Sequence, residues 1–158
     1  MSSPGEKPLV GVLMGSKSDQ GLMQPALDML TELGITHEVS VMSAHRNPQR
    51  IHDYATNARS RGLQVIIAGA GAAAHLPGVI ASWTTLPVIG VPLPTSDLKG
   101  LDSLFSIAQM PGGIPVACMA VGSAGAKNAA IFAAEVLALK YDAISKAIEA
   151  YRAKLAEG

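Results

Sequence analysis

The sequence is poor in charge, in aromatic residues and in cysteine, and each shortage excludes a class of protein. Charged residues make up only 15% of the 158 residues, and 12 basic residues balance 12 acidic ones. No basic stripe stands out from this balance, so we expect no nucleic-acid partner. The single cysteine, Cys118, excludes a disulfide framework, and its apolar neighbours indicate a buried hydrophobic side chain rather than a reactive thiol.

Hydrophobic runs long enough to cross a membrane are also missing. The most apolar helical pattern, 124–139, contains Lys127 and Glu135 and is too short to span a bilayer. The polar start, 1–8, has no hydrophobic stretch behind charged residues, so no signal peptide is visible. We therefore expect a cytoplasmic protein without a membrane partner.

What the sequence has in quantity is small and aliphatic residues. Hydrophobic residues make up 49% of the chain, but aromatic residues only 4%. The length favours a single domain over 1–158 with a flexible tail at 1–7. The apolar composition predicts that copies of the chain associate. The helix start at 122–130 has little bulk on one side, which favours close packing against a symmetry mate.

Short apolar runs alternate with helical patterns along the whole chain. Strands are predicted at 9–14, 36–41, 65–68, 87–91 and 116–120. Helices are predicted at 22–33, 48–61, 76–83, 102–109, 124–139 and 142–156. This order indicates an α/β three-layer sandwich with a five-stranded parallel sheet, flavodoxin-like or Rossmann-like. Ligands of such sheets bind beyond the carboxyl ends of the strands.

The stretch 43–48, Ser-Ala-His-Arg-Asn-Pro, lies between the second predicted strand and a helix that begins at Pro48. A helix N-terminus and Arg46 can hold an anion there while His45 moves a proton. The competing interpretation is a solvated histidine beside a surface ion pair of little energetic worth. The position at the sheet edge favours a functional role.

Two further segments are expected as loops at the same edge. In 15–19, the hydroxyls of Ser16 and Ser18 suit a phosphate and Asp19 suits sugar hydroxyls, although Ser18 or Asp19 as a helix cap would explain the same residues. The other loop is 68–71. The run 69–74 formally matches a dinucleotide fingerprint, but it follows the third strand and lacks the later acidic residue. Its small residues instead permit close approach of a ligand or another subunit.

The histidines at 37, 45, 52 and 75 show no spacing typical of metal ligands. His75 ends the small-residue run and is predicted either to line the pocket or to cap an interface. Two other classes remain open: a flavin- or nicotinamide-binding module, and a structural assembly protein. Scarce aromatics argue against the first, and the second leaves His45 and Arg46 unexplained.

Six short motifs occur in a fixed order: Gly15-Ser-x-Ser-Asp19, Ser43-Ala-His-Arg46, the 68–78 run ending Ala-Ala-His-Leu-Pro-Gly, Asp102-Ser-Leu, Gln109-Met-Pro-x-Gly-x-Pro-Val116 and Asn128-Ala-Ala130. Through them, residues 8–155 closely resemble the class I N5-carboxyaminoimidazole ribonucleotide mutases of bacterial purine biosynthesis. The chain departs from the usual pattern at Ala72, where many members have glycine, at 94–96 and at Lys127.

The resemblance implies an isomerase that moves a carboxylate from the exocyclic nitrogen of a nucleotide substrate to ring carbon four, without ATP, metal or organic cofactor. It implies a flavodoxin-like homo-octamer with sites built from neighbouring subunits and with a C-terminal helix, 140–158, packing on a neighbour. The nearest alternative is the class II carboxylase, which uses carbon dioxide directly.

The resemblance also assigns roles to individual residues. It makes His45 the acid and base. By the resemblance, Ser16, Asp19 and Arg46 hold the ribose phosphate. Chemical reasoning from the residues themselves adds Ser18 and Ser43 as binding groups away from the reacting bond. The resemblance places Ala70, Gly71 and His75 near the migrating carboxylate.

Overall fold

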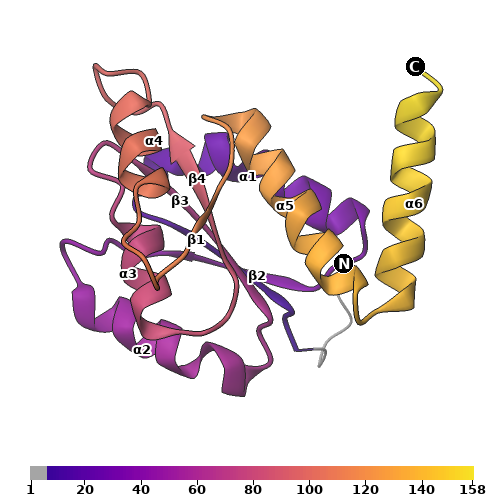
Figure 1. Cartoon of the computed structure of the whole chain (residues 1–158), viewed down its shortest axis with the longest axis horizontal. Helices are drawn as coiled ribbons and strands as arrows, with labels where there is room; N and C mark the ends of the chain where they lie inside the picture. The colour runs from indigo at the N-terminus through magenta and orange to yellow at the C-terminus, as the bar shows by residue number, and fades with distance from the viewer. Residues whose placement is uncertain (1–6) are drawn as a thin grey trace.

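Figure 1 shows a computed structural model in which one parallel sheet lies between two layers of helices; residues 7–158 are described. The tail expected at 1–7 lies outside the described residues except for Lys7. The carbonyl oxygen of Lys7 accepts a hydrogen bond of 3.0 Å from the hydroxyl of Thr36. No helix within 7–158 is both long and apolar enough to cross a membrane.

The sheet contains five strands in the order β2-β1-β3-β4-β5, all parallel. Their bounds are β1 (Val10–Met14), β2 (His37–Val41), β3 (Val65–Gly71), β4 (Val88–Leu93) and β5 (Ala117–Cys118). This is the flavodoxin-like order, so the α/β three-layer prediction is confirmed. The order reverses between β1 and β3, and a ligand crevice is therefore expected beyond the carboxyl ends of these two strands.

Residues 7–158 form six α-helices and one 3₁₀ turn, and the last two helices follow the last strand. These elements are η1 (Lys17–Asp19), α1 (Gln20–Glu32), α2 (Pro48–Arg61), α3 (Leu76–Trp83), α4 (Leu101–Ala108), α5 (Ser123–Ala138) and α6 (Asp142–Ala156). One core joins α1, α5 and α6 to one face of the sheet, and a second core joins α2, α3 and α4 to the other. In Figure 1, α6 stands at the edge of the molecule beside α5.

The local chemistry explains the boundaries of α2. Pro48 supplies a fixed φ at the first helical position, and the Asn47 side chain accepts a hydrogen bond of 3.1 Å from the Arg50 amide. Gly62 ends the helix with a left-handed φ of 107°. The predicted bounds 48–61 are confirmed.

The prediction of a loop at 68–71 was wrong, because β3 continues to Gly71. Gly69 and Gly71 pair in register with Val91 and Leu93 of β4. A Cβ at Gly69 would lie 2.4 Å from the sulfur of the buried Met23, so a side chain at this position would force Met23 to move. The glycine makes room for a neighbouring side chain, but the sequence pattern alone suggests the end of a strand at this position.

The fifth strand is much shorter than the predicted 116–120. Only Ala117 and Cys118 pair, with Ile89 and Gly90 of β4, and β5 forms the edge of the sheet. The fourth strand is longer than predicted and runs through Pro92 to Leu93. Sequence pattern alone does not reveal how many residues of an edge strand find partners.

Most small residues of α5 are buried inside the chain itself, so these residues do not meet a symmetry mate as expected, whereas Ala124 and Asn128 at the helix start are exposed. The fully buried alanines of α5 are Ala126, Ala129, Ala130, Ala133 and Ala134. They belong to the core shared with α1 and the sheet. Alanines at these positions let α5 approach both neighbours closely.

Candidate functional site

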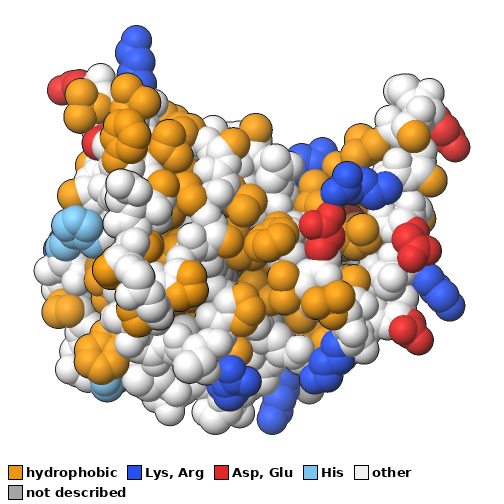
Figure 2. Space-filling view, viewed as in Figure 1, with side chains coloured by type: hydrophobic (Ala, Val, Ile, Leu, Met, Phe, Trp, Pro, Cys, Tyr) orange, Lys and Arg blue, Asp and Glu red, His pale blue; other side chains and the backbone are white. Residues whose placement is uncertain are grey.

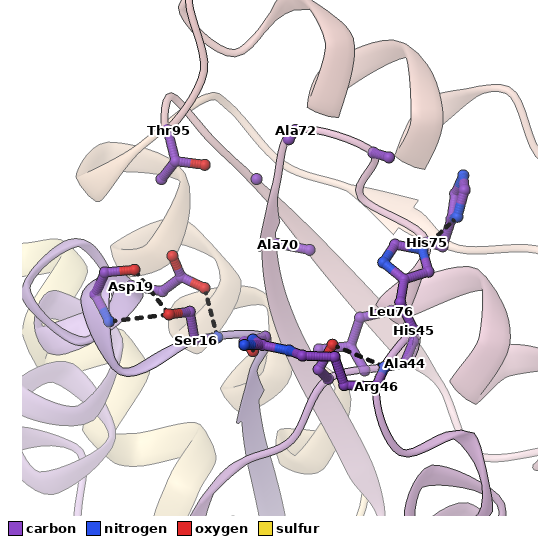
Figure 3. A pocket seen from close by; sticks show the side chains of 15 residues that line it. Ser16, Asp19, Ala44, His45, Arg46, Ala70, Ala72, His75, Leu76 and Thr95 are labelled. Atoms are coloured by element: carbon purple, nitrogen blue, oxygen red, sulfur yellow. Dashed lines mark hydrogen bonds between the residues drawn. The ribbon is translucent and has the colours of Figure 1, made fainter.

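All nine residues proposed from the sequence line one cleft at the carboxyl edge of the sheet (Figure 3). The cleft has a volume of about 350 Å³ and is formed by the segments that follow β1 and β2, by the end of β3 with the residues after it, and by Thr95 after β4. Its lining comprises Gly15, Ser16, Ser18, Asp19, Ser43, Ala44, His45, Arg46, Ala70, Gly71, Ala72, Ala73, His75, Leu76 and Thr95.

His45 and His75 are joined directly at one end of the cleft. Nε2 of His45 lies 2.7 Å from Nδ1 of His75, and the rings meet edge-to-face. An N–H···N hydrogen bond needs a proton on one nitrogen and a lone pair on the other, so each imidazole restricts the tautomer of its partner. The sequence left open whether His75 lines the pocket or caps an interface, and the structure places it in the lining of the cleft.

Arg46 connects two of the segments that form the cleft. Its guanidinium Nη2 donates a hydrogen bond of 3.3 Å to the carbonyl oxygen of Gly15, and its amide donates one of 3.3 Å to the Ser43 hydroxyl. Figure 3 shows the side chain extending toward Ser16. Among residues 7–158, no carboxylate pairs with Arg46. The cation is thus held in place with its charge available to a ligand.

Ser16 and Asp19 cap the turn that follows β1. The Ser16 amide donates a hydrogen bond of 2.9 Å to Oδ2 of Asp19, while the amide and hydroxyl of Ser18 donate to the Ser16 hydroxyl over 3.3 and 2.9 Å. The helix-cap interpretation and a place in the cleft therefore both hold for Asp19. The capping hydroxyl belongs to Ser16, however, and not to Ser18.

The Asp19 side chain is largely buried, with the residue only 5% exposed. Burial raises the pKa of its carboxyl above 3.8, and hydrogen bonds from Ser16, Ser18 and Gly15 partly oppose this rise. The two serines and the Gly15 amide thus favour the carboxylate that burial disfavours.

The stability of the protein should respond to pH through Asp19. A pKa that is higher in the folded chain means that the folded state binds more protons just above pH 3.8, so stability falls as pH rises through this window. We expect Asp19→Asn, which cannot ionise, to gain stability relative to the parent protein as pH rises from 3.8. Urea unfolding of both proteins over a pH series around this value measures the difference. A difference that does not change with pH would contradict the expectation.

Thr95 is a cleft residue that the sequence did not assign to the site. A Cβ at Gly71 would lie 1.6 Å from the Thr95 hydroxyl, so the Thr95 side chain covers the end of β3. The only feature of the sequence that could have drawn attention to Thr95 is the departure from the family pattern at 94–96. Ala72, another departure, has a left-handed φ of 48°, a conformation that favours the glycine common at this position in the resembling family.

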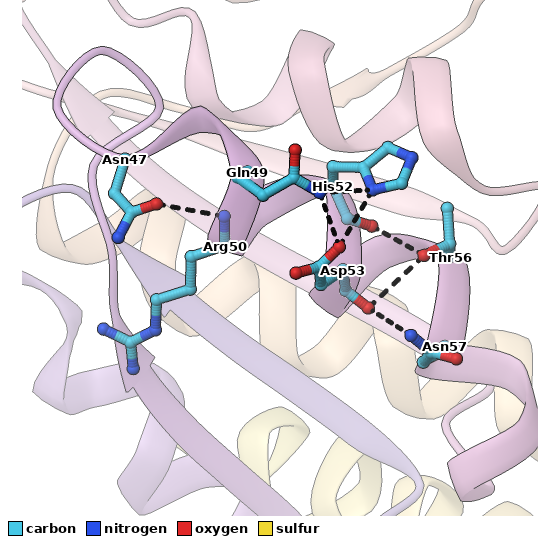
Figure 4. Close-up of polar contacts among 7 residues, drawn as sticks. All are labelled: Asn47, Gln49, Arg50, His52, Asp53, Thr56 and Asn57. Carbon is cyan, nitrogen blue, oxygen red and sulfur yellow. Dashed lines mark hydrogen bonds and ion pairs between the residues drawn. The ribbon is translucent and has the colours of Figure 1, made fainter.

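The two remaining histidines lie outside the cleft. His52 belongs to a polar cluster on α2 (Figure 4), where its Nδ1 lies 3.0 Å from an Asp53 carboxylate oxygen and its ring meets Trp83 edge-on. His37 Nδ1 lies 2.9 Å from the carbonyl oxygen of Ile35. Within the described residues, no three His, Cys, Asp or Glu side chains are grouped as a metal site.

Residues 9–158 match the protein family described as AIR carboxylase. The chain belongs to the AIR carboxylase family. Two relatives named N5-carboxyaminoimidazole ribonucleotide mutase illustrate the likeness. That of Thermotoga maritima is 55% identical over 148 residues, which cover 94% of this chain and 85% of that protein. That of Aquifex aeolicus is 57% identical over 143 residues, which cover 90% of this chain and 84% of that protein.

Solved structures agree with this membership of the AIR carboxylase family. The crystal structure of Treponema denticola PurE superposes with a TM-score of 0.85 at 28% sequence identity. The match covers 95% of this chain and 92% of that one. The family predicted from the six sequence motifs is therefore confirmed over nearly the whole length of the chain.

Proposed function

We propose that this AIR carboxylase family member is an isomerase of de novo purine biosynthesis that converts N5-carboxyaminoimidazole ribonucleotide to 4-carboxy-5-aminoimidazole ribonucleotide. The observation that carries the proposal is the His45–His75 pair in one cleft with Arg46, which no carboxylate pairs among residues 7–158. Relatives at 55% and 57% identity carry the name of this activity.

The reaction needs a single proton-transfer group. Cleavage of the bond between nitrogen and carboxylate releases carbon dioxide, and the electron pair left on nitrogen takes up a proton. Ring carbon four then attacks the carbon dioxide and loses its own proton. His45 gives the first proton and accepts the second, so it ends the cycle as it began. His75 holds the His45 ring and restricts its tautomer during both steps.

The remaining cleft residues hold the substrate away from the reacting bond. Arg46 and the hydroxyls at 16, 18 and 43 bind the phosphate, and Asp19 accepts hydrogen bonds from the ribose. Ala70 and Gly71 leave room for the migrating carboxylate, with His75 nearby. Such remote contacts fix the ring against His45 and reduce the entropy lost on reaching the transition state.

Closure of the cleft comes from neighbouring subunits in a homo-octamer. In the single chain His45, Arg46 and His75 are exposed, although trapped carbon dioxide requires a closed pocket. Figure 2 shows apolar side chains across the face formed by α4, the 109–116 segment and α5. Large exposed hydrophobic residues that favour association are Trp83, Leu98, Leu101, Phe105, Phe132, Leu139 and Leu155.

The C-terminal segment 140–158 packs on one of these neighbours in the proposed assembly. Leu155, in the last turn of α6, is 57% exposed in the single chain. In this proposal the protein acts in the cytoplasm.

The test uses substrate with carbon-13 in its migrating carboxylate, mixed with enzyme and excess unlabelled bicarbonate in the absence of ATP. We expect the product to keep the label at ring carbon four, because the carbon dioxide stays in the closed pocket. Product without the label would favour the class II carboxylase reaction with free carbon dioxide. The absence of product would refute the proposed activity.

A further inference from the structure

A second cavity adjoins the substrate cleft on the side of α2. It has a volume of about 440 Å³ and shares four lining residues with the cleft: Gly15, Ser16, Ser43 and Arg46. The two cavities are therefore neighbours, and Arg46 lies at their boundary. The proposed substrate roles account for the cleft but not for this extension.

The adjoining cavity is lined by three cations. Lys17, Arg46 and Arg50 contribute to its walls, and none of its lining residues among 7–158 is Asp or Glu. The substrate cleft, by comparison, contains the carboxyl of Asp19. A concave surface with charge of one sign concentrates counter-ions, so this cavity attracts anions.

Backbone carbonyls hold both guanidinium groups in place. Nη1 of Arg50 donates a hydrogen bond of 3.3 Å to the carbonyl oxygen of Val41, the last residue of β2. Arg46 makes the equivalent contact with Gly15, directly after β1. Figure 4 shows Arg50 extending away from the polar cluster of His52 and Asp53. Neither arginine pairs with a carboxylate in the described part of the chain, and each keeps free N–H donors.

We propose that Lys17 and Arg50 form a second oxyanion subsite, so that the combined cleft holds two phosphoryl groups at once. The inference rests on the proposed function, which places the phosphate of a ribonucleotide against Arg46. The second phosphoryl group is either the terminal phosphate of a nucleoside 5′-diphosphate or a free phosphate ion. In the first case, nucleoside diphosphates bind this cleft in competition with the substrate.

The test compares the 5′-monophosphate and the 5′-diphosphate of aminoimidazole carboxamide ribonucleoside by titration calorimetry. We expect the parent protein to bind the diphosphate about tenfold more tightly, which is the effect of one or two charge-assisted hydrogen bonds. Arg50→Gln should reduce this preference to about twofold or less, and Lys17→Gln should weaken it. Arg59→Gln, another arginine of α2 that lines neither cavity, is the matched control and should keep the preference.

A second arm separates the two phosphate sources. Inorganic phosphate is titrated into protein saturated with the monophosphate. A binding event that Arg50→Gln removes identifies free phosphate as a ligand of the subsite. A diphosphate preference without such an event identifies the terminal phosphate of a nucleotide instead.

Two results would overturn the second subsite. One is equal affinity for the two nucleotides with no binding of free phosphate. The other is a uniform loss of affinity for both nucleotides in Arg50→Gln, which would place Arg50 in the first phosphate site. Turnover of labelled substrate by the same parent protein shows whether a negative result concerns the proposed reaction or only the second subsite. An active enzyme that shows neither a diphosphate preference nor binding of free phosphate refutes only the subsite, and either of these signals without turnover refutes only the proposed reaction.

Discussion

Replacing His45 by Asn should lower turnover about a thousandfold while the dissociation constant of the substrate stays within about twofold. Asparagine is close to histidine in size and hydrogen-bonds, but it cannot carry a proton between the exocyclic nitrogen and ring carbon four. The fold should not change, because His45 is exposed at the rim of the cleft and contributes nothing to either core. Single-turnover conversion measures the rate, and calorimetry measures substrate binding.

His52→Asn is the matched control for this variant. His52 is also partly exposed and contacts neighbouring side chains, but it lies on α2 outside the cleft. Its replacement should leave turnover unchanged. Near-normal turnover of His45→Asn would remove His45 from the reaction. An equal loss of rate and of binding would instead make His45 a residue that only holds the substrate.

The sequence predicts the fold well because its signals are local. Pro48 and Gly62 mark the two ends of α2 through their own backbone geometry. The alternation of apolar runs and helical patterns determines a parallel sheet, and the carboxyl ends of parallel strands share one edge. Residues from three segments therefore reach one cleft although up to 60 positions separate them, as for Gly15 and His75.

What the sequence did not predict depends on contacts between distant residues. Gly69 was read as part of a loop, yet Met23 packs against the strand at this glycine. The buried alanines of α5 were assigned to a subunit contact, since a pattern of small residues does not say which partner approaches. Nothing in the spacing of His45 and His75 indicates that their ring nitrogens lie 2.7 Å apart. Nothing in the sequence singles out Arg50, whose hydrogen bond to the carbonyl oxygen of Val41 holds its side chain beside the cleft.

Gly125→Ala should cost about 3 kcal/mol of unfolding free energy or more, because the added methyl group meets backbone that cannot rotate away. A Cβ at Gly125 would lie 1.6 Å from the carbonyl oxygen and 2.6 Å from the carbonyl carbon of Ala120. Ala120 lies between β5 and α5, so relief of the clash requires the first turn of α5 to move away from the sheet. Urea unfolding at one fixed protein concentration measures the loss, since association would otherwise change the apparent stability.

Gly21→Ala makes the same chemical change in a helix and should have the opposite sign. Gly21 lies in the first turn of α1, and a Cβ there meets nothing within 4 Å. Alanine restricts the unfolded chain and favours the helix, so we expect a gain of about 0.5 kcal/mol. Because both variants carry equal changes in helix propensity, their difference isolates the contact between Gly125 and Ala120. Equal effects of the two substitutions would mean that α5 moves freely at this point and that the close approach does not hold it against the sheet.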